Sequence, residues 1–457
     1  KFAAKPVPLA KQEREIFQNV IALWDSLLQG YLRCLNSIMG GESAVAGHAA
    51  LVCQRALWCL GQRMAEHYKC FQQIGSEEWT ILHRVFRYAE SRGVLGHEVS
   101  EPTHKSEKTT CQQTYIAALL IHLACDPSEQ TAKQMGVLRR WLERWAPKVN
   151  VRKSHSATEP GLPPIAVDLA SSRGPVHEAP SGDSARFLDL GEVSKSIRSR
   201  VAQLRKGETP PALGLGEDIA AAAAEQLLLV VHRHWCEQPK ARASARRPVV
   251  IAARLCAGLA SMHYHISGKP FRQPGQAREL SKEQREEIAT FGRVASRQDD
   301  EHSLAQGFAL EDWTIREESL GGLRIECSRE SGKGRYVQHQ LIAVRPADAK
   351  TYMLGMMRWL QVSYNFELRS GVRVLPGVPR CVAVRATGLN VMSENYVQAL
   401  LLPPVPALQT QASLILPAGW FRPKRVVEVY TDAPEQILLT GIVDRGSDFE
   451  RVSFSAP

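Results

Sequence analysis

Apolar residues recur every three or four positions in the first third of the chain, which is the spacing of one face of an α-helix. The first such stripe predicts a single long helix and consists of Ile16, Val20, Leu23, Trp24, Leu27, Leu28 and Tyr31. Four further amphipathic segments, separated by Gly, Pro and Asp-Pro breaks, cover residues 49–68, 77–89, 112–123 and 131–145. The pattern therefore predicts an α-helical domain over residues 1–147.

The helical periodicity is lost after residue 147. Residues 148–185 carry five prolines among Ser, Gly and Ala, namely Pro160, Pro163, Pro164, Pro175 and Pro180. Such a composition buries little apolar surface, so we expect a linker or long loop. Helical spacing resumes where Asp189 and Glu192 can cap a helix, and two further helices are predicted over 217–235 and 248–265. Residues 186–288 thus form a second helical region, with a basic connection at 240–247.

Beyond Leu310 apolar and polar residues tend to alternate, which is typical of β-strands. Six short strands are predicted over 312–317, 322–327, 340–344, 351–360, 366–374 and 380–385, and they indicate a small β-barrel over residues 289–388. Four more strand-like segments cover 396–402, 412–416, 425–430 and 437–443. They either extend the barrel or form a separate β-subdomain over residues 389–457, and the pattern does not decide between the two. The expected fold class is α+β multidomain, with N-terminal helical domains followed by a C-terminal β-barrel and an additional β-subdomain.

Composition narrows the class of protein. The 457 residues are 44% hydrophobic and 23% charged, which is typical of a folded chain. No apolar stretch approaches the roughly 20 residues of a membrane-spanning helix, and the first residues show no export signal, so we expect a cytoplasmic protein without a membrane span. The ten cysteines form no C-x-x-C pair, which favours reduced, mostly buried thiols. The formal net charge of +10 suits a nucleotide or polyanion without identifying one.

The strongest candidate for a binding site is a pair of arginines, Arg293 and Arg297, placed just before the predicted barrel. A guanidinium group is flat, permanently charged and forked, so it can stack on a guanine base or bind phosphate oxygens with two N–H groups. The same R-x-x-x-R spacing occurs at Arg140/Arg144, Arg242/Arg246 and Arg369/Arg373. The spacing alone is therefore not specific, and we favour Arg293 and Arg297 for their position before the barrel and the turn that follows.

That turn begins at Glu317 and contains Ser319, Gly321 and Gly322, at the start of a predicted strand. The Glu317 carboxylate could accept hydrogen bonds from guanine N1 and N2, the Ser319 hydroxyl can donate or accept, and the two glycines allow close approach of backbone to a ligand. An R-x-x-x-R segment followed by an acidic x-S-x-x-G turn at a barrel resembles the PilZ family of bacterial receptors. The resemblance covers roughly residues 290–385, and Gly355 to Trp359 is similar to a mid-barrel strand of that family.

The resemblance to PilZ proteins implies a PilZ-like barrel that binds cyclic di-GMP through Arg293, Arg297, Glu317, Ser319, Gly321 and Gly322. It also implies a regulator in bacterial second-messenger signalling, in which ligand binding at the barrel is coupled to a helical region that docks a protein partner. The ligand would be cyclic di-GMP, and no cofactor is expected. Glu317 stands where the family usually has Asp or Asn, which supports an alternative: a ligand-free PilZ-like scaffold for protein–protein interaction.

Other motifs carry less weight. His232, His234, Cys236, His263 and His265 suggest a zinc site, but residues two apart on a helix point about 200° apart, so we expect no metal. The basic segment 240–247 contains no aromatic residue, which disfavours nucleic acid as a partner. No nucleophile elbow, H-E-x-x-H motif or catalytic carboxylate pair is present, so no enzyme activity is expected. For Trp359 we expect a packed core aromatic.

Overall fold

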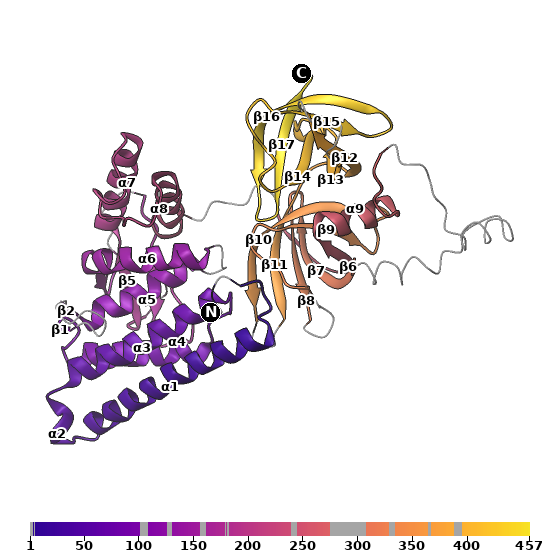
Figure 1. Ribbon diagram of the computed structural model, residues 1–457. Helices are drawn as coiled ribbons and strands as arrows, with labels where there is room; N and C mark the ends of the chain where they lie inside the picture. The colour runs from indigo at the N-terminus through magenta and orange to yellow at the C-terminus, as the bar shows by residue number, and fades with distance from the viewer. Residues whose placement is uncertain are drawn as a thin grey trace. The chain divides into compact units, whose positions relative to one another are not determined.

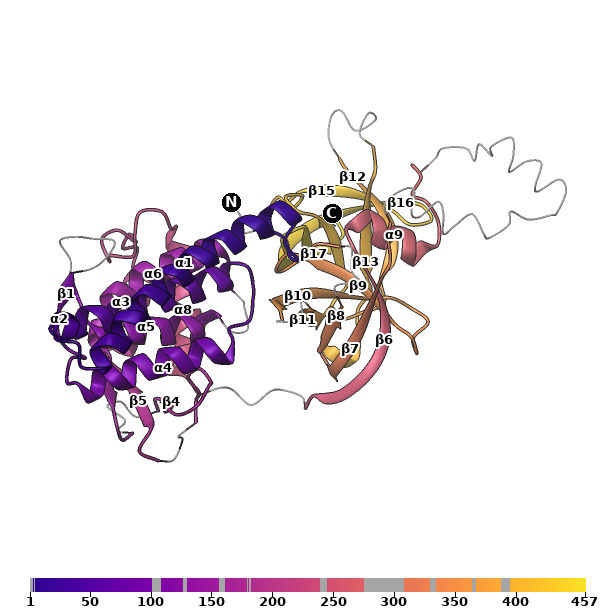
Figure 2. The same ribbon diagram turned by 90° about the horizontal axis from the view of Figure 1, so that it is seen from below.

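The computed structural model describes residue 3 and residues 5–100, 108–125, 130–155, 161–178, 180, 182–238, 245–274, 308–328, 334–363, 367–387 and 395–457. The chain forms two compact units (Figures 1 and 2). The first comprises Lys1–Ala243 with Gln361–Asn365, and the second comprises Ser244–Leu360 with Phe366–Pro457. Over the described ranges, no helix combines the length and the apolar character that crossing a membrane requires.

The first unit is helical. Its helices are α1 (Lys11–Met39), α2 (Ser43–Ala46), α3 (Ala49–Lys69), α4 (Ser76–Ser91), α5 (Cys111–Cys125), α6 (Ala132–Trp145), α7 (Gly191–Arg205) and α8 (Ala221–Cys236), with a short 3-10 turn at Ala146–Lys148. A two-stranded ribbon, β1 (Val99–Ser100) with β2 (Lys108–Thr109), precedes α5. The five helices predicted in the first third of the sequence are thereby confirmed.

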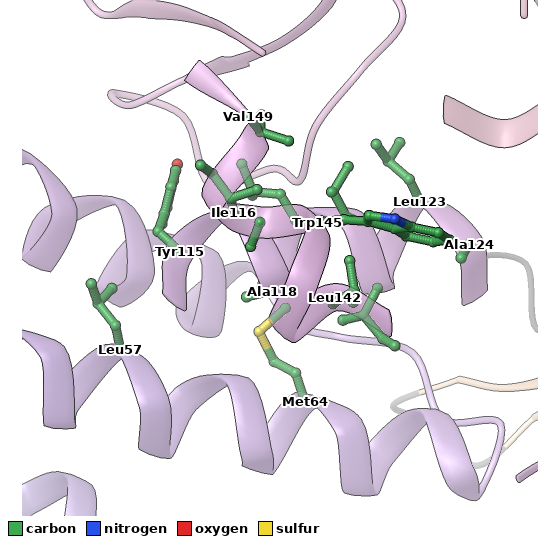
Figure 3. Close-up of a cluster of buried hydrophobic side chains, with 14 of the residues drawn as sticks. Leu57, Met64, Tyr115, Ile116, Ala118, Leu123, Ala124, Leu142, Trp145 and Val149 are labelled. Carbon is green, nitrogen blue, oxygen red and sulfur yellow. The ribbon is translucent and has the colours of Figure 1, made fainter. Parts of the chain in front are cut away.

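Helix α5 lies at the centre of the helical unit because it is apolar on nearly all sides. Its side chains are buried by α3, α4, α6 and α8. Figure 3 shows the cluster around the Trp145 indole, in which side chains of α3, α5 and α6 meet. The indole N–H of Trp235 on α8 donates to the Leu120 carbonyl oxygen at 3.0 Å, so this buried polar group has a partner.

The linker predicted over residues 148–185 is wrong in part, because this stretch contributes to a small sheet. Strands β3 (Asn150–Arg152), β5 (Ala185–Asp189) and β4 (Ile165–Asp168) pair antiparallel in that order. The side chains of Ile165, Ala166 and Val167 are completely buried. The apolar run is only three residues long and prolines precede it, so composition over the whole stretch concealed it.

The second unit opens with a closed six-stranded barrel. Its strands are β6 (Arg247–Ala257), β7 (Glu311–Ser319), β8 (Gly322–Cys327), β9 (Leu341–Pro346), β10 (Met353–Val362) and β11 (Leu368–Val374), in the order β10-β11-β8-β7-β6-β9. All the pairings described between them are antiparallel. This confirms five of the six strands predicted for the barrel.

The helix predicted over residues 248–265 is wrong for its first part, which forms strand β6. Val249, Val250 and Ile251 are β-branched and suit a pleated strand, and β6 pairs with both β7 and β9. The helix begins only after Gly258, whose φ of +84° turns the chain into α9 (Leu259–Ser267). The first barrel therefore includes Arg247–Ala257, which fall within the second helical region predicted over residues 186–288.

The last part of the chain forms a second closed barrel, which decides the alternative that the sequence left open. Its strands are β12 (Arg380–Ala386), β13 (Val397–Leu402), β14 (Ser413–Pro417), β15 (Val426–Tyr430), β16 (Pro434–Arg445) and β17 (Phe449–Ser455), in the order β12-β13-β14-β17-β16-β15. The predicted strand 380–385 belongs here rather than to the first barrel. Strand β17 was not predicted.

The two barrels and α9 share one apolar core. Phe449, Leu400 and Ile415 of the second barrel pack in a cluster with side chains of the first barrel and α9: Cys256, Met262, Leu341, Ala343, Tyr352, Leu354 and Met356. The β16–β17 turn also reaches the first barrel, since the Asp448 carboxylate accepts from the Leu341 amide at 2.9 Å. The two barrels are therefore held together by apolar packing and a hydrogen bond as well as by the covalent connection between them.

A charged network crosses the same junction. Asp444 on β16 accepts from Arg373 on β11 at 2.5 Å and from Arg451 on β17 at 3.2 Å. Arg451 is 5% exposed, and its Nε donates to the Ser413 hydroxyl at 2.8 Å. A buried guanidinium needs a counter-charge, so Asp444 compensates Arg451 and links the two barrels at once.

All ten cysteines are free thiols, and eight of them are buried. Burial raises the pKa of the Cys53 and Cys256 thiols to about 12. Such groups stay protonated and unreactive at neutral pH, in agreement with the prediction of reduced, mostly buried thiols.

His83 of α4 is completely buried and has a partner at each ring nitrogen. Its Nε2 lies 2.8 Å from the Arg173 carbonyl oxygen, and its Nδ1 lies 2.8 Å from the Tyr115 hydroxyl. Because a carbonyl oxygen only accepts, Nε2 carries the proton and Nδ1 accepts from Tyr115. This pattern uses the neutral imidazole, and desolvation by burial lowers the pKa of His83.

We expect His83 to make the helical unit less stable in acid. Its folded pKa lies below the ordinary value of 6.5, so the unfolded chain binds more protons between the two values and stability falls as pH decreases through that window. Urea unfolding followed by circular dichroism at pH 8 to 5 should show a shallower pH dependence for His83→Gln than for the wild type. The exposed His97, changed to Gln, serves as the control and should leave the slope unchanged. Equal slopes for His83→Gln and the wild type would contradict the assignment.

Removing the carboxylate of Asp444 should destabilise the second unit by about 3 kcal/mol, because it leaves the buried Arg451 without a counter-charge. Arg373→Ala should cost less than about 1 kcal/mol, since the Arg373 side chain is 39% exposed. Both values can be measured by chemical denaturation of Asp444→Ala and Arg373→Ala. Equal losses in the two variants would show that Arg451 does not depend on Asp444.

Candidate functional site

The candidate site lies at one end of the first barrel, where β6 begins, β7 ends and β8 begins. Its centre is the carboxylate of Glu317, which two arginines contact. Arg246 Nη1 lies 3.0 Å from Glu317 Oε2, and Arg324 Nη1 lies 2.8 Å from Glu317 Oε1. The Arg246 and Arg324 side chains are 34% and 41% exposed. The three groups therefore form a solvent-accessible cluster of two positive charges around one negative charge.

Strand register places these residues together. Glu317 of β7 is opposite Pro248 of β6 on one side and Arg324 of β8 on the other. The register shifts between Pro248 and Ile251 on β6, and again between Ile315 and Glu317 on β7. Such bulges bend a strand and redirect its side chains. The Glu317 carboxylate thereby contacts the arginine that precedes β6 as well as the one on β8.

The turn after β7 contains the other predicted site residues. Ser319 pairs with Gly322, and its hydroxyl donates to the Gly322 carbonyl oxygen at 3.1 Å. A Cβ on Gly322 would lie 3.0 Å from the Val372 carbonyl oxygen of β11, so the glycine allows β8 to approach β11 closely. A Cβ on Gly321 would have no atom within 4 Å, and Leu320 is 79% exposed. The turn thus exposes Leu320 and leaves open space beside Gly321.

Glu317 and Ser319 lie on β7, Gly321 lies in the turn and Gly322 begins β8, and their role in ligand binding stays a prediction. Arg293 and Arg297 lie outside the described residues, so their contribution stays a prediction. Arg246, predicted as part of a basic connection, instead contacts Glu317. Arg324 of β8 was not singled out at all.

A signal for Arg246 was present in the sequence. The pair Arg242/Arg246 stands directly before the β-branched run Val249–Ile251, and recognising that run as a strand would have put this pair at the entrance to the barrel. Arg242 itself lies outside the described residues. The other R-x-x-x-R pairs have different partners: Arg140 contacts Asp218 at 2.6 Å, Arg144 donates to the Gly214 carbonyl oxygen at 2.6 Å, and Arg369 contacts Glu367 at 2.9 Å.

Trp359 of β10 is half-buried rather than a fully packed core residue. Its indole lies over Gly371 of β11, where any Cβ would overlap the ring. Gly371 is opposite Arg324 in the β8–β11 register. Trp359 on β10 is therefore separated from Arg324 on β8 by β11. Within the described ranges, no group of three or more His, Cys, Asp or Glu residues is arranged to hold a metal ion.

Comparison with known families identifies related sequences at both ends of the chain. Residues 1–156 match the family described as "Cyclic-di-GMP receptor FimW, N-terminal domain", and residues 382–457 match the "FimW C-terminal beta-barrel domain". The chain is also 22% identical to the "Cyclic-di-GMP receptor FimW" of Pseudomonas aeruginosa, over 95% of this chain and 77% of that protein. These descriptions name a receptor and its domains, not an enzyme family.

The matched ranges correspond to structural units. Residues 1–156 include α1 to α6, and residues 382–457 cover nearly all of the second barrel. The cluster at Arg246, Glu317 and Arg324 lies between the two matches, in the first barrel. The chain is thus similar to a cyclic-di-GMP receptor family on either side of the candidate site.

Replacing Glu317 should change the stability of the ligand-free protein only slightly. Its two ion pairs are partly exposed, so we expect Glu317→Gln to lower the free energy of unfolding by less than about 1 kcal/mol. Thermal unfolding of Glu317→Gln measures this change in stability. Glu318→Gln, which removes the neighbouring ion pair with Arg247, is the matched control. A loss of several kcal/mol for Glu317→Gln alone would give the cluster a structural role instead.

Proposed function

We propose that this protein is a cyclic di-GMP receptor and that the ligand binds at the Glu317 end of a PilZ-like first barrel. The observation that carries the proposal is the contact between Arg246 and Glu317, because it joins an R-x-x-x-R segment to the acidic x-S-x-x-G turn. The similarity of both ends of the chain to proteins described as cyclic-di-GMP receptors supports the same ligand.

In this proposal Arg242 and Arg246 are the arginine pair of the PilZ-like motif. They immediately precede β6, the first strand of the barrel, whereas Arg293 and Arg297 come between α9 and β7. Arg293 and Arg297 can still contribute from that connection, and the experiment below separates the two pairs.

The chemistry of the cluster suits a guanine nucleotide with phosphodiester groups. Without ligand, Glu317 partly neutralises Arg246 and Arg324. When cyclic di-GMP binds, Arg246 can turn to a phosphate or to guanine O6 and N7, while Glu317 accepts from guanine N1 and N2. The Ser319 hydroxyl retains lone pairs that accept hydrogen bonds. Binding therefore exchanges ion pairs within the protein for an ion pair or hydrogen bonds from arginine to the ligand and hydrogen bonds that Glu317 accepts from the ligand.

Arg242 and Arg246 also explain how binding would reach the helical region. The boundary between the two units falls between Ala243 and Ser244, so the arginine pair spans it in sequence. A ligand that holds both arginines restricts the connection and can change which orientations of the units are populated. The helical unit would then present its surface to a protein partner in the cytoplasm.

A ligand-free scaffold is the second candidate, and one observation favours it. The Glu317 carboxylate already has two arginine partners, and it replaces the shorter Asp or Asn typical of the family that the motif resembles. A protein in which this cluster is purely structural would retain the barrel as an interaction surface and bind no nucleotide.

Isothermal titration with cyclic di-GMP decides between these functions. We expect the wild type to bind, and both Arg246→Ala and Ser319→Ala to raise the Kd at least tenfold, because each removes a direct contact with the ligand. Arg140→Ala is the matched control, since Arg140 belongs to an R-x-x-x-R pair in the other unit. It should bind like the wild type.

Two outcomes would contradict the proposal in different ways. If the folded wild type releases no heat and shows no thermal shift with cyclic di-GMP, the scaffold function is favoured. If Arg293→Ala/Arg297→Ala abolishes binding while Arg246→Ala retains it, the ligand is cyclic di-GMP but the arginine pair is the one predicted from the sequence.

A further inference from the structure

Helix α1 has an apolar strip that the described residues of the helical unit leave exposed around Leu23 and Leu27. Of the stripe predicted from the sequence, Leu28 is buried, whereas Leu23 and Leu27 are 67% and 49% exposed. The buried side of α1 consists of Phe17, Leu28, Leu32, Leu35 and Ile38, and this side packs chiefly against α3. In Figures 1 and 2, α1 lies along the edge of the helical unit beside α3.

The exposed residues form a narrow strip along the helix. At about 100° per residue, Leu27 lies about 40° to one side of Leu23 and Gly30 about 20° to the other. A Cβ on Gly30 would have no atom within 4 Å, so the backbone is open to close approach there. Ile16, Val20 and Cys34 lie at similar angles around the helix, but they are half-buried because each also packs against a core cluster of the helical unit. A second helix could therefore pack along this strip at short distance.

Two exposed charges, Glu15 and Arg33, flank the strip on one side. They are 18 residues apart, which is about five turns of 3.6 residues, so they lie at the same angle around the helix. In an antiparallel pair of identical helices, equivalent flanks face each other. Glu15 of one copy would then meet Arg33 of the other, and the pair would occur twice. This is the charge complementarity expected when the occupant is a second copy of the chain.

The apolar and charged residues place the two-fold axis within one position of each other. The midpoint between Glu15 and Arg33 is position 24, and the midpoint between Leu23 and Leu27 is position 25. A two-fold axis between these two positions brings each set opposite its counterpart to within about one residue. We propose that α1 pairs antiparallel with α1 of a second copy about this axis, so that the protein forms a symmetric dimer through its helical unit.

The proposed interface is small. The helix length between Glu15 and Arg33 is about 27 Å, and a single helix pair of this length buries less than the roughly 1,200 Å² typical of tight complexes. The dimer should therefore be weak and depend on protein concentration. Its test needs no cyclic di-GMP, because α1 and the Glu317 cluster belong to different units.

Sedimentation equilibrium of the full chain tests whether the protein dimerises. Charge-reversal variants test whether Glu15 of one copy lies opposite Arg33 of the other. We expect a reversible monomer–dimer equilibrium in the wild type. Glu15→Arg and Arg33→Glu should each weaken it about tenfold, because each places like charges opposite each other. The double variant Glu15→Arg/Arg33→Glu should restore the wild-type affinity to within about threefold. Exposed Glu77 on α4, changed to Arg, is the control and should have no effect.

Disulfide crosslinking tests the antiparallel arrangement independently. Ser26 lies next to the proposed axis, so Ser26→Cys should crosslink to its own counterpart under mild oxidation. Residue 33 and its counterpart would be about 25 Å apart along the axis, so Arg33→Cys should not crosslink. The wild type retains half-buried Cys34 and serves as the background.

Three results would overturn the proposal. A wild type that remains monomeric at every concentration would show that the strip does not bind a second copy. Single charge reversals without effect would place the dimer elsewhere. Crosslinking at residue 33 but not at residue 26 would exclude the antiparallel register, even if the chain dimerises.

Discussion

The pairing of β6 with both β7 and β9 is the constraint on which the candidate site depends. Those two ladders close the first barrel, and the first of them fixes Pro248 opposite Glu317. Arg246 precedes β6 by one residue, so it reaches the Glu317 carboxylate only in this register. If β6 shifted by one position, its side chains would exchange faces and the basic residues before it would move away from the turn.

The sequence allowed the helices and most strands to be predicted because their apolar residues repeat with one clear period. Residues 16–31 follow a single helical stripe, and residues 322–327 alternate strictly between buried and half-buried positions. The error at 248–265 arose because Leu255, Leu259 and Met262 continue at helical spacing across Gly258. A glycine at positive φ ends a strand and starts a helix at that point, but its φ is not visible in a hydrophobic pattern.

The candidate site could be predicted only in part for the same reason. The turn residues Glu317 to Gly322 are consecutive, so a local motif finds them. Arg246 and Arg324 meet Glu317 through pairing between strands that are far apart in the sequence. A helix predicted over 248–265 separates Arg242/Arg246 from the predicted barrel, so the pattern favours Arg293/Arg297, which are closer to β7 in the sequence. The wrong secondary structure predicted for 248–265 therefore led to a different arginine pair being predicted for the site.

The second barrel gives the candidate site a direct connection to the C-terminal part of the chain. Gly322 is opposite Arg373 in the β8–β11 register, and Arg373 binds Asp444 of β16. A ligand that displaced Gly322 would therefore act on a strand that already bonds to the second barrel. The shared core around Phe449 resists independent movement of the two barrels. The two barrels therefore belong to one compact unit, in which the candidate site and the second barrel are joined through β11.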